Sequence, residues 1–76
     1  MKMTVKRIER IASYTADKMG LVVNDWHSNV LALVDSYACA VVLIDVDGFY
    51  KPFNRNYDYT SDVCDMLDTL GLKEQD

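Results

Sequence analysis

The chain has 76 residues, half of them hydrophobic and 26% charged, and eight Lys or Arg against twelve Asp or Glu give a net charge of −4. This composition is typical of a globular protein, and the length supports one core, so we interpret residues 1–76 as a single domain. No apolar run approaches the ~20 residues that span a bilayer, and residues 1–7 begin charged and become amphipathic, unlike a secretory signal. We therefore expect a cytoplasmic protein without a membrane partner.

Residues 5–19 have the pattern of an amphipathic helix. Apolar side chains recur there at steps of three and four, which places them on one face. Thr4 precedes this segment and can accept a hydrogen bond from a first-turn amide as its N-cap. Gly20 follows it and suits the left-handed conformation that ends many helices.

Beyond Gly20 the pattern changes to that of strands. Residues 21–26 are predicted to form a strand, and residues 27–29 supply turn residues. Residues 30–34 are a short apolar run for which we favour a second strand. A helix capped by Ser28 is the alternative, because periodicity does not separate the two in so short a run.

Residues 38–46 are strongly apolar and predict a further strand. The Asp47-Gly48 pair that follows is typical of a two-residue hairpin turn, in which both residues take positive φ. Residues 49–51 then form the returning strand.

This hairpin register decides which side chains share a face of the sheet. It places Asp45 opposite Tyr50, and it puts Tyr50 on the same face as Val41 and Leu43. In so small a protein the helices cover only one face, so the other is left to a partner or to a second copy of the chain. We expect Leu43 and Tyr50 to lie on that contact face.

A final helix is predicted over residues 61–70, with Thr60 or Ser61 as its cap and Gly71 as its end. The expected fold is therefore α+β: a helix, an antiparallel sheet of three or four strands, and a second helix. Of the two cysteines, Cys39 and Cys64, each lies in an apolar pattern, so we expect buried, reduced thiols and not a disulfide framework.

One motif, at residues 45–48, resembles that of a catalytic site. Asp-Val-Asp-Gly after an apolar strand resembles the first motif of the haloacid dehalogenase-like phosphatases, where the first aspartate is the nucleophile and the second an acid/base near magnesium. Phe49 stands where that family has threonine, and 76 residues leave no room for its parallel sheet, so we favour the hairpin. His27 is the single histidine, and neither a Cys-x-x-Cys pair nor a Gly-rich phosphate loop is present. We expect no catalytic residue, metal or cofactor.

An acidic stripe runs along the last helix. Its members follow one another at steps of four, three and three, which lines carboxylates along one side of a helix: Asp58, Asp62, Asp65 and Asp68. Solvation of an ordinary helix explains such a row, and so does imitation of a phosphate backbone that occupies a basic groove. The sequence leaves both explanations open.

Charge is divided unevenly along the chain, with five basic and two acidic residues in 1–20 (+3) and three basic and ten acidic residues in 21–76 (−7). The element order is similar to that of double-stranded-RNA-binding domains, but their second helix is basic and this one is acidic, which disfavours direct nucleic-acid binding. In size, acidity and element order the chain resembles phage-encoded anti-CRISPR and anti-restriction proteins.

This resemblance predicts a non-catalytic protein-binding module: a small inhibitor that occupies a basic surface of its partner. The partner would be a nuclease or another nucleic-acid-binding protein, and the location would be the host cytoplasm if the chain is phage-encoded. The first alternative is a homodimeric structural or regulatory module. The second is a nucleic-acid-binding domain that uses the basic first helix.

Overall fold

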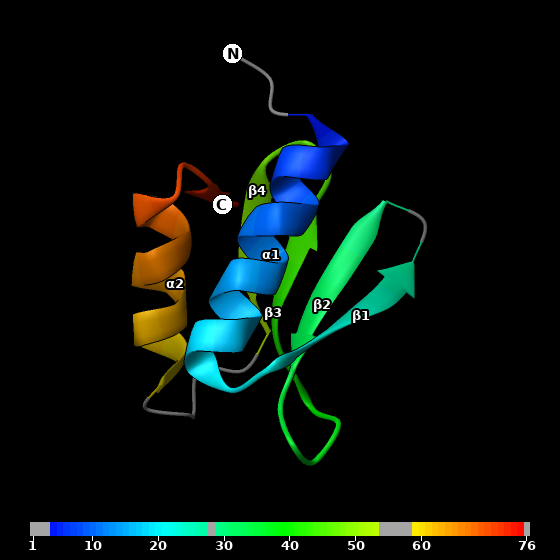
Figure 1. Ribbon diagram of the computed structural model, residues 1–76, viewed down its shortest axis with the longest axis vertical. Helices are drawn as coiled ribbons and strands as arrows, with labels where there is room; N and C mark the ends of the chain where they lie inside the picture. Colours follow the sequence, from blue (N-terminus) through cyan, green and yellow to red (C-terminus); the bar gives the residue numbers. More distant parts are fainter. Residues whose placement is uncertain (1–3, 28, 54–58, 76) are drawn as a thin grey trace.

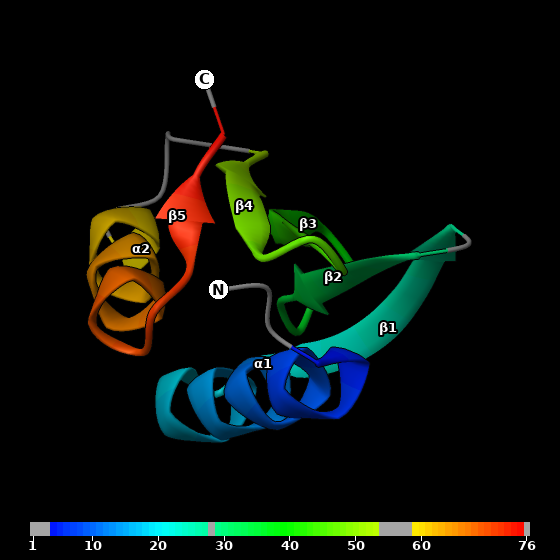
Figure 2. The ribbon, with the colours of Figure 1, turned by 90° about the horizontal axis from the view of Figure 1, so that it is seen from above.

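Five strands form one sheet, and both helices lie against the same face of it. The computed structural model describes residues 4–27, 29–53 and 59–75. The elements follow the chain in this order: α1 Val5–Met19, β1 Val22–His27, β2 Val30–Val34, β3 Ala40–Asp45, β4 Phe49–Pro52, α2 Tyr59–Thr69 and β5 Lys73–Glu74. Figure 1 and Figure 2 show α1 and α2 together on the inner side of the curved sheet. The predicted α+β class is confirmed.

The strands follow the order β1-β2-β3-β4-β5 across the sheet. Neighbours from β1 to β4 are antiparallel, as expected, whereas β5 pairs with β4 in parallel. The sheet is therefore mixed, and its five strands exceed the three or four that the sequence predicted. None of the described helices is long and apolar enough to cross a membrane.

Helix α1 has the bounds that its sequence predicted. The Thr4 hydroxyl accepts a hydrogen bond from the Arg7 amide at 3.2 Å, and Gly20 takes the left-handed conformation with φ 70°. Its three basic side chains in the first two turns point to solvent, because the opposite face is the apolar one. The buried side chains of that face are Ile8, Ile11, Ala12, Thr15 and Ala16.

Residues 30–34 form strand β2, so the helical alternative is wrong. β2 pairs with β1 on one side and β3 on the other, and Leu31 lies opposite both Asp25 and Ile44. Apolar side chains cover both of its faces, since Leu33 packs toward the helices and Ala32 belongs to a second cluster on the far face. A strand buried on both faces has no polar alternation, and its sequence therefore reads like a buried helix.

The hairpin between β3 and β4 differs from the predicted one by a single residue. Ile44 pairs with Tyr50, and a three-residue turn ending at Gly48 joins the strands. The Gly48 amide donates to the Asp45 carbonyl at 3.1 Å, and the Asp45 carboxylate accepts the Asp47 amide at 2.9 Å. Gly48 has φ 95°, but Asp47 does not take the expected positive φ. This arrangement is a turn followed by one left-handed residue, the common three-residue hairpin.

The one-residue difference moves Tyr50 to the opposite face, because successive side chains of a strand alternate between faces. Tyr50 lies with Val42 and Ile44 in the cluster under the helices and is 1% exposed. The prediction that it shares an open face with Leu43 is wrong. Val41 also packs toward the helices, because the register of β3 against β2 shifts beside it.

Helix α2 ends in a Schellman motif. The Gly71 amide donates to the Asp68 carbonyl at 3.1 Å, the Leu72 amide donates to the Leu67 carbonyl at 3.0 Å, and Gly71 has φ 106°. Leu72 is 2% exposed and packs into the core, which turns the chain back toward the sheet. The two residues of β5 follow directly, and this reversal is what brings them beside β4.

Two predictions about single side chains are also wrong. Thr60 and Ser61, expected as caps, lie inside the first turn of α2, and Thr60 is 2% exposed. Cys39 is exposed in the β2–β3 loop, whereas Cys64 on α2 is buried as expected. Cys39 and Cys64 are not joined in a disulfide bond.

Candidate protein-binding surfaces

The acidic stripe of α2 is divided by the fold into members with different surroundings. Asp62 and Asp65 are exposed on the solvent side of the helix. Asp68 also borders solvent, but its carboxylate accepts a hydrogen bond from the Tyr50 hydroxyl at 2.6 Å. Asp58 lies outside the described residues. We define the acidic face of α2 by Asp62, Asp65 and Asp68.

Tyr50 ties this face to the sheet. Its ring is buried beneath α2, and its hydroxyl reaches Asp68 from the β4 side. Burial raises the pKa of the Tyr50 phenol above its ordinary value, and the hydrogen bond and negative charge of Asp68 raise it further. The phenol is therefore a permanent donor at neutral pH, and it holds the Asp68 carboxylate in one orientation.

The sheet face opposite the helices carries no secondary-structure element within the part of the chain that the structure describes (Figure 2). Leu43 lies there as predicted, half-buried against a small cluster. The buried members of that cluster are Ala32, Val34 and Ala40.

Aromatic side chains on this open face were missed by the sequence interpretation. Trp26 of β1 and Phe53, which follows β4, are 40% and 57% exposed, and their ring centroids are 5.7 Å apart. The register of β1 shifts between Asp25 and His27, so Trp26 is an extra, bulged residue. Bulges redirect side chains, and here the ring extends across the sheet toward Phe53. The aromatic enrichment of strand ends was visible in the sequence, but their meeting across two strands was not.

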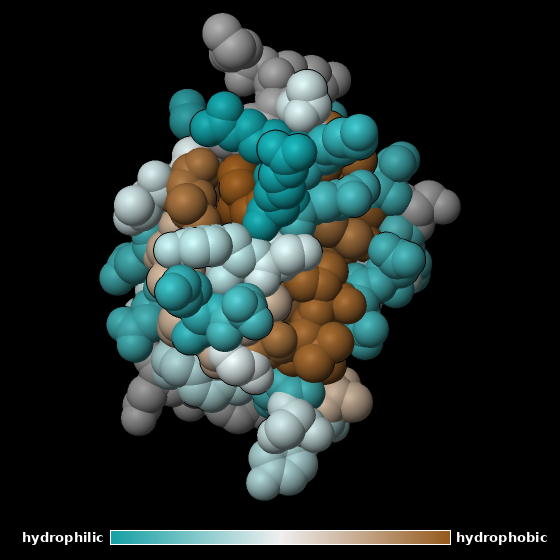
Figure 3. Space-filling view, viewed as in Figure 1, coloured by the Kyte–Doolittle hydropathy of each residue, from teal (hydrophilic) through white to brown (hydrophobic). Residues whose placement is uncertain are grey.

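A second exposed apolar surface lies along the edge strand β1. Figure 3 shows a hydrophobic patch beside the hydrophilic solvent face of α1, over β1. Val22 is 59% exposed, and its neighbours Leu21 and Val23 are half-buried against the cluster under the helices. An edge strand with exposed apolar residues is available for pairing, although Asp25 and the bulge interrupt it.

Asp45 and His27, the residues considered for catalysis and metal binding, lie at the ends of β3 and β1. Asp45 lies at the end of β3 opposite Val30, and its carboxylate is engaged by the turn amide of Asp47. His27 is exposed at the end of β1, with its ring against Trp26 at 6.0 Å. Among the residues that the structure describes, no three His, Cys, Asp or Glu side chains lie close enough together to hold a metal ion.

Comparison of the chain with known protein families, with curated proteins and with solved structures found no match.

Proposed function

We propose that this chain is a non-catalytic protein-binding module, a small inhibitor whose acidic face of α2 occupies a basic, nucleic-acid-binding surface of a partner. The observation that carries the proposal is the exposure of Asp62 and Asp65, one turn apart, on a helix that has no Lys or Arg from Tyr59 to Thr69. Residues one turn apart lie about 5–6 Å from each other, so the helix presents a row of anionic oxygens.

The hydrogen bond that holds Asp68 supports the same proposal. A side chain that is already held loses little rotational freedom when a partner binds, and this reduces the entropic cost of association. Asp68 is held by Tyr50 at 2.6 Å, so one carboxylate of the row is fixed before binding. A row of exposed charges also accelerates encounter with a basic surface, in a manner that salt suppresses.

The experiment compares two double variants as baits in affinity capture from a cell lysate, followed by mass spectrometry and binding kinetics with the captured protein. Asp62→Asn with Asp65→Asn removes charge and keeps shape, and it spares the Asp68 carboxylate that Tyr50 requires. We expect at least tenfold slower association for this variant, release of the wild-type complex by salt, and competition by DNA or heparin.

The matched control is Lys6→Ala with Arg10→Ala, which changes two exposed charges on α1. Its partner binding should equal that of the wild type. Loss of binding in this control, with full binding in the Asp62/Asp65 variant, would contradict the proposal and make α1 the contact surface.

A homodimer through the open sheet face is the second candidate function. Trp26, Phe49 and Phe53 are 40%, 41% and 57% exposed, which at ~150–250 Å² for each aromatic side chain corresponds to roughly 200–350 Å² of exposed aromatic surface. A standard interface buries about 800 Å² on each partner, so these rings would form its centre and not its whole area. Light scattering over a range of protein concentrations tests this candidate: a dimer mass in the wild type that Phe53→Ser reduces to the monomer mass supports it, and a monomer throughout excludes it.

A further inference from the structure

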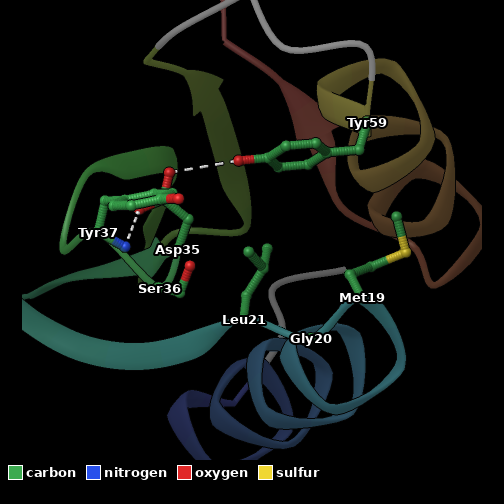
Figure 4. Close-up of a pocket in the computed structure, with 7 residues that line it drawn as sticks. All are labelled: Met19, Gly20, Leu21, Asp35, Ser36, Tyr37 and Tyr59. Atoms are coloured by element: carbon green, nitrogen blue, oxygen red, sulfur yellow. Dashed lines mark hydrogen bonds between the residues drawn. The ribbon is translucent and has the colours of Figure 1, made fainter.

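A pocket of about 390 Å³ lies where the end of α1, the β2–β3 loop and the start of α2 meet. Such a volume is at the lower end of the range for ligand sites and suits a single large side chain. Figure 4 shows Met19, Gly20 and Leu21 on one side of the space, with the Tyr59 hydroxyl directed across it toward Asp35. The lining residues are Met19, Gly20, Leu21, Asp35, Ser36, Tyr37 and Tyr59.

The carboxylate of Asp35 is held rigidly by its own loop. One oxygen, Oδ1, accepts the amides of Tyr37 at 2.9 Å and Cys39 at 3.0 Å. The other, Oδ2, accepts the Tyr59 hydroxyl at 3.3 Å from the first turn of α2. Backbone hydrogen bonds between Asp35 and Cys39 and from Ala38 to Asp35 close the same loop. The negative charge is therefore fixed at the pocket wall.

The electrostatic surroundings of the pocket favour a cation. Met19 and Gly20 place the C-terminal end of α1 at its rim, and that end of a helix carries a partial negative charge. None of the seven lining residues that the structure describes is basic. Lys18, the basic residue of the last turn of α1, is elsewhere, with its Nζ 5.6 Å from the centre of the Tyr14 ring.

The remaining walls match the other parts of a long cationic side chain. Met19 and Leu21 supply apolar surface on which an alkyl stem can lie. Tyr37 also lines the pocket and is 86% exposed, and its amide donates to the Asp35 carboxylate. An aromatic face next to a carboxylate binds a planar cation by stacking and by charge together.

We propose that this pocket receives an arginine side chain of a partner protein, an inference that rests on the proposed function because it requires a basic partner. The guanidinium stacks on Tyr37 and donates to the Asp35 carboxylate, while the stem packs against Met19 and Leu21. Arginine fits better than lysine, because its planar, weakly hydrated head stacks on an aromatic ring, whereas an ammonium keeps its water.

The test is an NMR titration of the ¹⁵N-labelled full chain with N-acetyl-arginine methylamide as the probe. We expect saturable shifts at the amides of Gly20, Leu21, Ser36 and Tyr37, and weaker binding of the matching lysine probe. Asp35→Asn keeps an oxygen for the loop amides and removes the charge, and it should weaken binding about fivefold or more. Tyr37→Leu should weaken it about two- to fivefold, because an exposed cation–π contact is lost.

Matched controls repeat these changes outside the pocket. Asp47→Asn and Tyr14→Leu alter exposed residues of the same types and should leave probe binding unchanged. Equal binding of the neutral N-acetyl-norleucine methylamide, or full arginine binding by Asp35→Asn, would overturn the proposal. So would tighter binding of the lysine probe than of the arginine probe.

The two proposals fail in different ways. The Asp62→Asn, Asp65→Asn variant should bind the arginine probe as the wild type does, because its substitutions lie outside the pocket lining. If that variant keeps its partner while the probe still requires Asp35, the acidic face of α2 is not the contact surface and the pocket stands. If the variant loses its partner and the probe does not bind, the pocket is refuted and the proposed function stands.

Discussion

Replacement of Tyr50 by Phe tests whether the bond between β4 and α2 stabilises the fold. The substitution removes only the hydroxyl that donates to Asp68 at 2.6 Å and leaves the buried ring in place. Hydrogen bonds to charged groups contribute about 1.5–3 kcal/mol. Because Asp68 borders solvent, water can replace the lost donor, so we expect a loss near the lower limit, about 1.5 kcal/mol. For a domain of this size that lowers Tm by about 6–12 °C.

Substitutions at Asp68 should differ from one another in a defined order. Asp68→Ala leaves the buried Tyr50 hydroxyl without this acceptor, which costs about 1–3 kcal/mol. Asp68→Asn keeps an acceptor oxygen and also removes a negative charge from the last turn of α2, where an acid is unfavourable by about 0.3–1 kcal/mol. The Asn variant should therefore be nearly as stable as the wild type. Urea unfolding at pH 7 measures all three, and an Asn variant as unstable as the Ala variant would refute the reasoning.

The same pair predicts a dependence on alkaline pH. The pKa of Tyr50 is raised in the folded state, so above pH 10 the unfolded chain loses a phenolic proton that the folded chain retains. The advantage of the wild type over Tyr50→Phe should be constant below pH 10 and shrink above it, by up to about 1.4 kcal/mol per pH unit. Parallel stability curves for the two proteins between pH 9 and 11 would show that the phenol is not perturbed.

Four further substitutions test the fold by urea or thermal unfolding. Gly48→Val should destabilise the fold by about 1–2 kcal/mol, because φ is 95° at this position, although a Cβ would meet nothing within 4 Å. Asp47→Ala should destabilise it less. Equal losses of stability in the two variants would favour a two-residue turn. Thr15→Val should stabilise the fold by about 1 kcal/mol, since the buried Thr15 Oγ1 has no hydrogen-bond partner among the described groups. Destabilisation by this substitution would indicate that Oγ1 has a hydrogen-bond partner. Leu72→Ala should destabilise the fold by about 2–4 kcal/mol and weaken the protection of the Lys73 amide from hydrogen exchange. An unchanged exchange rate at Lys73 would show that β5 does not depend on the burial of Leu72.

Local rules predicted the elements whose causes are local. The α1 helix needed only its apolar period, the Thr4 cap and the Gly20 stop, and each is in place. The hairpin register failed because Asp47-Gly48 suits a two-residue and a three-residue turn alike. The three-residue turn is favoured by the Asp45 carboxylate, which accepts a hydrogen bond from the Asp47 amide. A rule based on the Asp-Gly dipeptide does not include that hydrogen bond.

Non-local features were beyond the sequence pattern. Strand β5 has two residues, too few for any periodicity, and it forms because Leu72 folds back into the core. The contact of Trp26 with Phe53 joins the two outer strands of the antiparallel part of the sheet and depends on a bulge that no motif marks. The sequence predicted a sheet face without helices, but of the side chains on that face it predicted only Leu43 correctly.

The surroundings of the acidic residues likewise depend on the fold and do not follow from their spacing along α2. Spacing along the sequence treats Asp62, Asp65 and Asp68 as equivalent, yet Tyr50 fixes one of them and leaves the other two to solvent. It also omits Asp35, which Tyr59 joins to the first turn of α2, three residues before Asp62. Tyr59 therefore connects the Asp35 carboxylate of the β2–β3 loop to the end of α2 that carries Asp62. On the two proposals together, a partner would be recognised by an arginine in one position as well as by its basic charge in general.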